Sequence, residues 1–257
     1  MDPREGLDSI LTDLIKDVRV VLGPNAMGIY LYGSAVSGGF DPGVSDLDLV
    51  VLTDAEVGSI DLAGLERMHA DFVGRHPEWD DRIEVVYIGQ ATLRSFRTSP
   101  GSLAVISPGE SFHVTGPVVD WDQNWYQVRE YGVALFGTPA AEVIPLISRS
   151  EYIAAVARYA AWLGNQSLDT LSPCSLAYTV LSLCRALRTV QIGEPCSKQE
   201  GAAWTKKRMP DWTQVIDASL SCRLSRGTTG FEDEAMRFAA RSFIRVLADQ
   251  ISRLAQA

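Results

Sequence analysis

The sequence predicts an α+β fold, in which a first half that mixes strands and helices is followed by an all-helical second half. In the first half, short apolar runs typical of strands alternate with segments whose apolar residues follow helical spacing. From residue 150 onward the spacing is helical only, and the connections are short, which favours an antiparallel bundle. We therefore expect two domains, residues 1–148 and 149–257, with the boundary in the segment 139–150.

The elements of the first half follow from apolar spacing and from turn residues. Residues 7–22 carry apolar side chains every three or four positions until Gly23-Pro24-Asn25 ends the pattern, which predicts a helix. Residues 58–75 are also predicted to be helical, and continuous apolar runs predict strands at 27–32, 46–53, 82–88 and 133–136. Residues 89–116 have no clear period, so we expect a mobile loop on the substrate side, with a strand at 112–114 as an alternative for part of it.

The remaining elements are predicted to be helices. Residues 118–132 should form one that buries Trp121, Trp125 and Tyr126, because aromatic residues at this spacing are more often core than ligand-binding. Pro210 interrupts the helical pattern of the second half. The helices expected there span 150–163, 173–192, 197–209, 212–224 and 231–254.

Composition excludes several classes of protein. A net charge of −9 argues against a nucleic-acid-binding surface, which is normally basic, and is compatible with a small cationic substrate. The four cysteines form no Cys-x-x-Cys pair and there are three histidines, so neither a zinc site nor a disulfide framework is expected. The first residues are polar, and no apolar run reaches the roughly 18 residues of a spanning helix. We expect a cytoplasmic protein with no membrane partner.

The chemistry is concentrated in one stretch between two predicted strands. It begins Leu31-Tyr32-Gly33-Ser34, continues through a glycine-rich turn, and ends Asp46-Leu47-Asp48. Residues two apart on a strand point to the same face, so the two aspartates place their carboxylates side by side. Two adjacent like charges repel unless a cation lies between them, and hard oxygen ligands suit Mg²⁺. A solvated strand end is the alternative for an isolated pair.

A third carboxylate makes the metal interpretation the stronger one. Glu84 lies within the predicted strand Ile83-Glu84-Val85-Val86, where a glutamate is costly to bury unless it is paired or metal-bound. Together with the Gly33-Ser34 turn, the three acidic residues indicate a site for a metal and a nucleotide.

This pattern resembles the nucleotidyltransferase superfamily related to polymerase β. More narrowly, two sequence segments resemble the streptomycin/spectinomycin 3''/9-adenylyltransferases. They are Leu-Tyr-Gly-Ser-Ala-Val-Ser-Gly-Gly and, after it, Ser-Asp-Leu-Asp-Leu-Val-Val. The resemblance implies an N-terminal nucleotidyltransferase domain with a mixed sheet and a C-terminal helical bundle that completes the cleft. It also implies that Mg²⁺ is bound by Asp46, Asp48 and Glu84, and that Gly33 and Ser34 bind the outer phosphates of ATP.

Two cations of the second half extend this resemblance. Arg185 lies in an otherwise apolar helix, where a buried guanidinium needs an anion, and Lys198 begins the next helix, where an ammonium and the helix dipole both favour phosphate. The family has an apolar helix with an arginine and then a helix beginning Lys-x-x-x-Ala, and both bind ATP. Arg188 is the competing cation, and a side chain that extends to solvent is the alternative for Arg185 and Lys198.

The sequence departs from the family where drug-modifying members bind the ammonium groups of the antibiotic. Those members have acidic residues just before the arginine helix, whereas residues 172–178 contain no carboxylate. Asp169 is the nearest acidic residue. Either Asp169 substitutes, or the acceptor is not a streptomycin-like cation.

The resemblance implies a reaction in which AMP moves from ATP to a hydroxyl group and pyrophosphate is released. Glu84 would accept the proton of that hydroxyl or bind a second metal ion. The acceptor is expected to be a small hydroxylated molecule such as an aminoglycoside or aminocyclitol, with a protein hydroxyl, another metabolite, or nucleotide binding without catalysis as alternatives. His113 is a further candidate acid or base, His69 and His76 are expected at the surface, and a monomer is expected.

Overall fold

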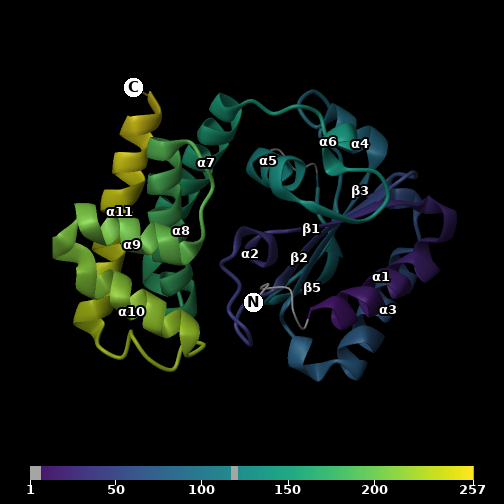
Figure 1. The fold of residues 1–257 in the computed structure, drawn as a ribbon. Coiled ribbons are helices and arrows are strands. Elements are labelled where there is room, and N and C mark those ends of the chain that lie inside the picture. The colour runs from purple at the N-terminus through teal and green to yellow at the C-terminus, as the bar shows by residue number, and fades with distance from the viewer. Residues whose placement is uncertain (1–6, 117–120, 257) are drawn as a thin grey trace. The chain divides into compact units, whose positions relative to one another are not determined.

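The computed structural model describes residues 7–116 and 121–256. The chain divides into two compact units, Met1–Ile147 and Ser148–Ala257 (Figure 1). The first unit contains all the strands of the described residues, and the second is helical. The predicted α+β fold class is confirmed.

The first unit is built on a six-stranded sheet with the order β5-β4-β3-β2-β1-β6. Neighbouring strands β2 and β3 are parallel and the other neighbouring pairs are antiparallel, so the sheet is mixed. The strands are β1 (Ala26–Tyr32), β2 (Leu47–Thr53), β3 (Ile83–Gly89), β4 (Ala104–Ser107), β5 (Glu110–Val114) and β6 (Val133–Phe136).

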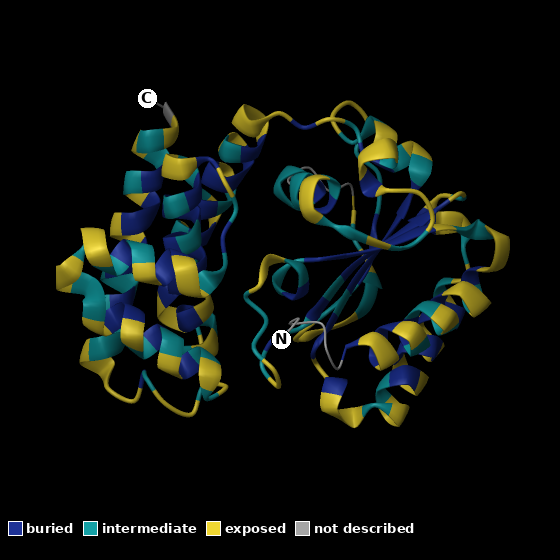
Figure 2. Cartoon of the chain, viewed as in Figure 1, coloured by how far each residue is buried: buried dark blue, intermediate teal, exposed yellow. Residues whose placement is uncertain are grey.

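Both faces of the sheet are covered, which explains why its central strands are apolar along nearly their whole length (Figure 2). One face packs against α1 (Asp8–Leu22) and α3 (Leu62–Arg75). The opposite face packs against α4 (Gln90–Ser95), α5 (Asp122–Tyr131) and α6 (Ala140–Val143). Trp125 of α5 is buried, as predicted for the core, whereas Trp121 and Tyr126 are only partly buried against it.

The region predicted to be a loop is folded instead. Residues 89–116 form α4 and the antiparallel pair β4 and β5, which extends the sheet beyond β3. The two strands are short and have no clear period; β4 pairs with the edge of β3, and β5 pairs with β4. The predicted helix at 118–132 is shorter, since α5 begins at Asp122; residues 118–120 lie outside the described residues.

The prediction that His69 lies at the surface is wrong. Its side chain on α3 is buried, and Nε2 lies 2.8 Å from the hydroxyl oxygen of Tyr87 on β3. Burial lowers the pKa of His69 to about 4, so the native imidazole is neutral at neutral pH. His76, at the end of the same helix, is partly exposed and lies 3.4 Å from a carboxylate oxygen of Asp13.

The second unit is a helical bundle centred on one long helix. Helix α8 (Pro173–Ile192) contacts each of the other four long helices and contributes the largest number of buried residues. These four are α7 (Arg149–Gly164), α9 (Lys198–Arg208), α10 (Thr213–Leu224) and α11 (Glu234–Gln256). Ser148 and Ser197 are the N-cap residues of α7 and α9 and form capping boxes, which satisfy backbone N–H groups at each helix start. Within the described residues, no helix is both long and apolar enough to cross a membrane.

Candidate active site

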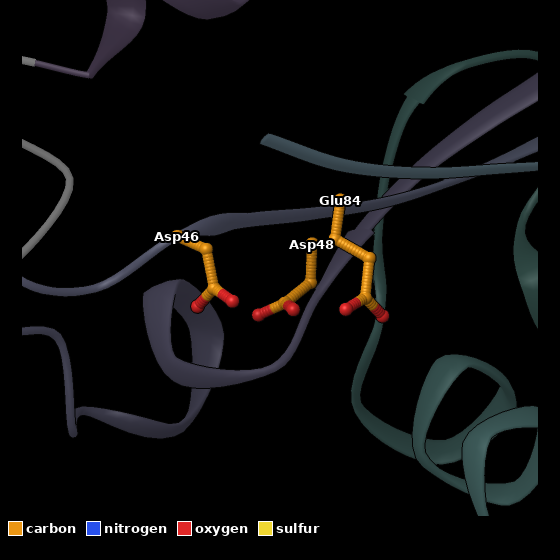
Figure 3. A group of neighbouring side chains, drawn as sticks. All are labelled: Asp46, Asp48 and Glu84. Atoms are coloured by element: carbon orange, nitrogen blue, oxygen red, sulfur yellow. The ribbon is translucent and has the colours of Figure 1, made fainter. Parts of the chain in front are cut away.

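The three carboxylates predicted from the sequence lie together at one end of β2 and β3. Asp48 on β2 is the register partner of Glu84 on β3, and Asp46 lies just before β2 begins. Each residue offers a carboxylate oxygen, and these three atoms lie within 4.8 Å of one another (Figure 3). All three side chains are half-buried. Parallel pairing of the two strands therefore brings residues 36 positions apart onto one row of the sheet.

The donor set of this cluster fits a hard divalent cation. Carboxylate oxygens are the ligands that Mg²⁺ prefers, and one or two carboxylates together with substrate phosphates are its usual protein environment. Three acidic groups this close would repel one another without a compensating positive charge. Asp46, Asp48 and Glu84 are therefore suited to hold a hard divalent cation such as Mg²⁺.

The Gly33-Ser34 turn lies directly beside these carboxylates. Gly33 has a φ of +67°, and a Cβ atom at this position would lie 1.9 Å from Oδ2 of Asp48. Only glycine fits there, because any side chain would displace the carboxylate. Ser34 begins the short helix α2 (Ser34–Ser37), and its Oγ atom is buried without a hydrogen-bond partner among the described residues. A buried hydroxyl left unpaired costs about 1–3 kcal/mol, which a phosphate oxygen would recover by accepting a hydrogen bond from it.

Tyr32 belongs to the same row, although it was not among the site residues predicted from the sequence. It is the register partner of Asp48, and its hydroxyl group donates a hydrogen bond of 3.2 Å to Oε1 of Glu84. Burial, and then the neighbouring carboxylates, raise the pKa of Tyr32 well above its usual value, so the phenol remains protonated and able to donate. Its position immediately before Gly33 is the sequence signal that could have identified it.

Arg82 holds the backbone that leads into Asp46. The buried guanidinium donates from Nε (3.0 Å) and Nη2 (2.5 Å) to the carbonyl oxygen of Ser45, and from Nη1 (3.1 Å) to that of Glu78. The carbonyl of Arg82 in turn accepts the N–H of Leu47 at 2.9 Å. Charge-assisted hydrogen bonds are stronger than neutral ones, so this side chain fixes where β2 begins. No feature of the sequence distinguishes Arg82 from a surface arginine.

The second unit brings Arg185 and Lys198 onto neighbouring helices. Arg185 is on α8 and Lys198 is the first residue of α9. The helices approach closely at Gly201, where a Cβ atom would lie 2.7 Å from the backbone N and Cα of Arg185. Both cations are partly exposed, so the guanidinium of Arg185 is less buried than the sequence suggested. The Nζ atom of Lys198 lies 4.3 Å from the ring centre of Tyr178.

The competing cation Arg188 has different surroundings. Its Nη1 atom is buried and has no hydrogen-bond partner among the described residues. It lies near Cys196. Burial raises the pKa of the Cys196 thiol, and the positive charge of Arg188 acts in the opposite direction. The contact with Cys196 indicates a packing role where α8 meets the start of α9, and the unpaired Nη1 keeps Arg188 as the competing cation.

Two family models match consecutive parts of the chain. Residues 15–99 match a nucleotidyltransferase domain, and residues 142–249 match the C-terminal domain of aminoglycoside adenylyltransferase. The chain is an aminoglycoside adenylyltransferase-like nucleotidyltransferase. The first match contains Gly33, Ser34 and the three carboxylates, and the second contains Arg185 and Lys198. The predicted family and the prediction of an enzyme are confirmed.

A solved structure has a similar fold. It is the crystal structure of spectinomycin adenyltransferase AAD(9) from Enterococcus faecialis with ATP and spectinomycin, and it matches with a TM-score of 0.73. The sequences are 19% identical, and the match covers 95% of this chain and 98% of that one. No curated protein sequence matches the enzyme significantly.

Two other residues considered as candidates from the sequence, His113 and Asp169, have partners that do not belong to the carboxylate cluster. His113 lies on β5 of the enzyme, with Nδ1 2.8 Å from the carbonyl oxygen of Ser111 and Nε2 3.7 Å from a carboxylate oxygen of Glu110. Asp169 lies in the second unit, where a carboxylate oxygen is 3.2 Å from Nε of Arg241.

Proposed function

We propose that the enzyme transfers AMP from ATP to a hydroxyl group of an aminoglycoside or aminocyclitol antibiotic and releases pyrophosphate. The observation that carries this proposal is the convergence of three carboxylate oxygens within 4.8 Å of one another beside the Gly33-Ser34 turn. The match of the second half to an aminoglycoside adenylyltransferase domain supports the acceptor class. The similar structure from Enterococcus faecialis, which holds ATP and spectinomycin, supports the nucleotide and makes spectinomycin the first acceptor to test.

In this proposal Asp46 and Asp48 hold Mg²⁺, and Glu84 either shares it or acts as the base. Bound there, Mg²⁺ would neutralise phosphate charge and make the α-phosphorus more electrophilic. Gly33 allows the backbone to approach the phosphates, and the unpaired Oγ of Ser34 donates to one of their oxygens.

The acceptor hydroxyl attacks the α-phosphorus in line with the leaving group. A new P–O bond forms to the acceptor oxygen, and the bond from the α-phosphorus to the bridging oxygen breaks, so pyrophosphate leaves with that electron pair. The carboxylate of Glu84 accepts the proton of the hydroxyl as the attack proceeds. Arg185 and Lys198 offset the charge that develops on the pyrophosphate.

The acceptor is bound without the acidic residues that drug-modifying relatives place before the arginine helix. Asp169, the nearest acidic residue, already pairs with Arg241, and its side chain is 83% exposed. The net charge of −9 still favours a cationic acceptor through long-range attraction. We therefore rank spectinomycin and other aminocyclitols above streptomycin, with a protein hydroxyl or another metabolite as alternatives.

The test is pyrophosphate release from ATP and Mg²⁺ in the presence of spectinomycin, streptomycin or no acceptor. Release that depends on one drug, with a mass gain of one adenylyl group on that drug, is the expected result. Clear binding of ATP without release on either drug would contradict the antibiotic acceptor and direct the search to other hydroxyl compounds. Absence of Mg²⁺-dependent ATP binding would contradict the nucleotidyl transfer itself.

The proposal also includes a cytoplasmic monomer. All four cysteines are free thiols, which suits a reducing compartment. Analytical ultracentrifugation with and without ATP tests the monomer, and a concentration-dependent dimer would contradict it.

A further inference from the structure

We infer that Tyr32 is a positioning residue for Glu84, holding its carboxylate in the orientation that the acceptor hydroxyl requires. This inference rests on the role proposed above for Glu84. Tyr32 lies on β1 and Glu84 on β3, so the hydrogen bond between them spans the intervening strand β2. The bond runs from the phenol oxygen to Oε1 of Glu84 and is 3.2 Å long.

The register of the sheet explains why the phenol reaches this carboxylate. Tyr32 pairs with Asp48, and Asp48 pairs with Glu84, so the three side chains form one row on one face. A tyrosine is long enough to reach past the short aspartate beside it. A shorter residue at position 32 would leave Glu84 without this donor.

The phenol is held by packing and is therefore a fixed donor. Tyr32 is 5% exposed, and its ring belongs to the core on the face covered by α4, α5 and α6. A glutamate has three rotatable side-chain bonds, and here it lies beside two further negative groups. A rigid donor on one of its oxygens limits these rotations before substrate binds. The Glu84 side chain therefore loses less conformational freedom on reaching the transition state.

The chain provides a matched control two residues away on the same strand. Tyr30 points to the same face as Tyr32 and is fully buried. Its hydroxyl group donates to the carbonyl oxygen of Thr138 at 3.0 Å instead of to a carboxylate. Tyr30→Phe therefore removes a buried phenol oxygen from the same strand and face without touching Glu84.

The first experiment compares the kinetics and stability of Tyr32→Phe and Tyr30→Phe. We expect Tyr32→Phe to lower kcat by about 10- to 100-fold, because misplacement of a reacting group by about 1 Å can cost 100-fold in rate. The KM values for ATP and acceptor, and the affinity for ATP with Mg²⁺, should change less than about twofold. Tyr30→Phe should leave kcat unchanged. Equal losses of kcat in the two variants would show a general packing effect and overturn the inference.

A double variant shows whether Tyr32 acts through Glu84. If it does, adding Tyr32→Phe to Glu84→Gln should cause no further loss of turnover, because the group it positions is already altered. Losses that multiply in the double variant would overturn the inference.

A structural measurement separates this inference from the proposed function. Crystal structures of the wild type and of Tyr32→Phe should show the Glu84 carboxylate in different orientations, whether or not an acceptor has been found. An unchanged Glu84 in Tyr32→Phe would overturn the positioning role. A wild type that binds ATP but is inactive with every antibiotic would contradict the proposed acceptor. The comparison of the two crystal structures would then still test whether Tyr32 positions Glu84.

Discussion

The Cα atom of Gly33 packs directly against the carboxylate of Asp48, with room for no side-chain atom between them: a Cβ atom would lie 1.9 Å from Oδ2. The positive φ of Gly33 adds a backbone strain for any other residue. The glycine of the Gly-Ser turn therefore has two functions, since it permits the turn and it leaves space for a carboxylate of the candidate metal site.

Gly33→Ala should abolish most of the nucleotidyl transfer. The added methyl group displaces Asp48, and a misplaced ligand is expected to reduce turnover by at least about 100-fold. Gly38→Ala is the matched control, because Gly38 also has a positive φ, of +79°, but nothing lies within 4 Å of the place that a methyl group would take there. It should lower stability by about 1 kcal/mol and leave activity nearly intact. Pyrophosphate release and thermal unfolding measure both effects, and equal activity losses would contradict the steric argument.

Glu84→Gln should retain ATP binding and lose turnover. Glutamine has the shape of glutamate but does not accept the proton of the acceptor hydroxyl, and general-base catalysis contributes about 100- to 10,000-fold. Calorimetric titration with ATP and Mg²⁺, together with pyrophosphate release, measures the two properties separately. Unchanged turnover would remove Glu84 from the mechanism.

The two arginines of α8 should respond differently to loss of charge. Arg185→Met should weaken ATP binding by about 10- to 100-fold, since charge-assisted hydrogen bonds contribute about 1.5–3 kcal/mol. Arg188→Met should mainly lower stability, because the Arg188 guanidinium interacts with Cys196 where α8 meets the start of α9. ATP titration and thermal unfolding of both variants test this. Weaker ATP binding in Arg188→Met, with ATP binding unchanged in Arg185→Met, would show that Arg188 binds the phosphates instead.

Gly201→Ala should destabilise the second unit, although alanine is normally the better helix former. Replacing glycine by alanine inside a helix usually gains about 0.5–1 kcal/mol. Here the methyl group would lie 2.7 Å from the backbone of Arg185, so α9 must move away from α8, and overpacking of this kind costs about 1–3 kcal/mol.

Gly74 supplies the control for this substitution. It lies in α3, and an added methyl group would find nothing within 4 Å, so Gly74→Ala should be neutral or stabilising. Urea unfolding of both variants measures the sign. Stabilisation by Gly201→Ala would show that the two helices are not closely packed at this point.

Protonation of His69 should weaken the fold in acid. The pKa of His69 is lowered from 6.5 to about 4 by burial, so between these values the unfolded chain binds a proton that the native chain does not. Stability attributable to this residue is therefore fully present above pH 6.5 and is lost as the pH falls to about 4, by about 3 kcal/mol in all.

The variant His69→Gln isolates this contribution, because glutamine can still hydrogen-bond the hydroxyl group of Tyr87 without titrating. Urea unfolding of wild type and variant between about pH 7 and pH 4.5 gives the difference in stability at each pH. The pH dependence that comes from the carboxylates is the same in both proteins and cancels in this difference. The wild type should lose more stability than the variant as the pH falls. Parallel plots of stability against pH for the two proteins would contradict the conclusion that the His69 imidazole is buried and neutral.

Local sequence predicted the parts of the site that depend on neighbouring residues. The alternation of a strand places Asp46 and Asp48 on one side, and a glycine followed by a serine after a strand predicts the turn at Gly33 and Ser34. Glu84 stood out because a carboxylate within an apolar strand needs a partner. Helical spacing alone was sufficient to predict the all-helical second unit.

Other parts depend on contacts between distant segments, which no local pattern encodes. Strands β4 and β5 are short and weakly patterned, and the pairing of β4 with the edge of β3 and of β5 with β4 decides their conformation. His69 is buried on α3, and its Nε2 has a hydrogen-bond partner in a hydroxyl group from β3, far along the chain. The parallel register of β2 and β3 aligns Asp48 with Glu84 and brings Tyr32 within reach of the same carboxylate. The sequence by itself therefore determined which groups the site contains, and the pairing of strands far apart in the chain decided how those groups are held.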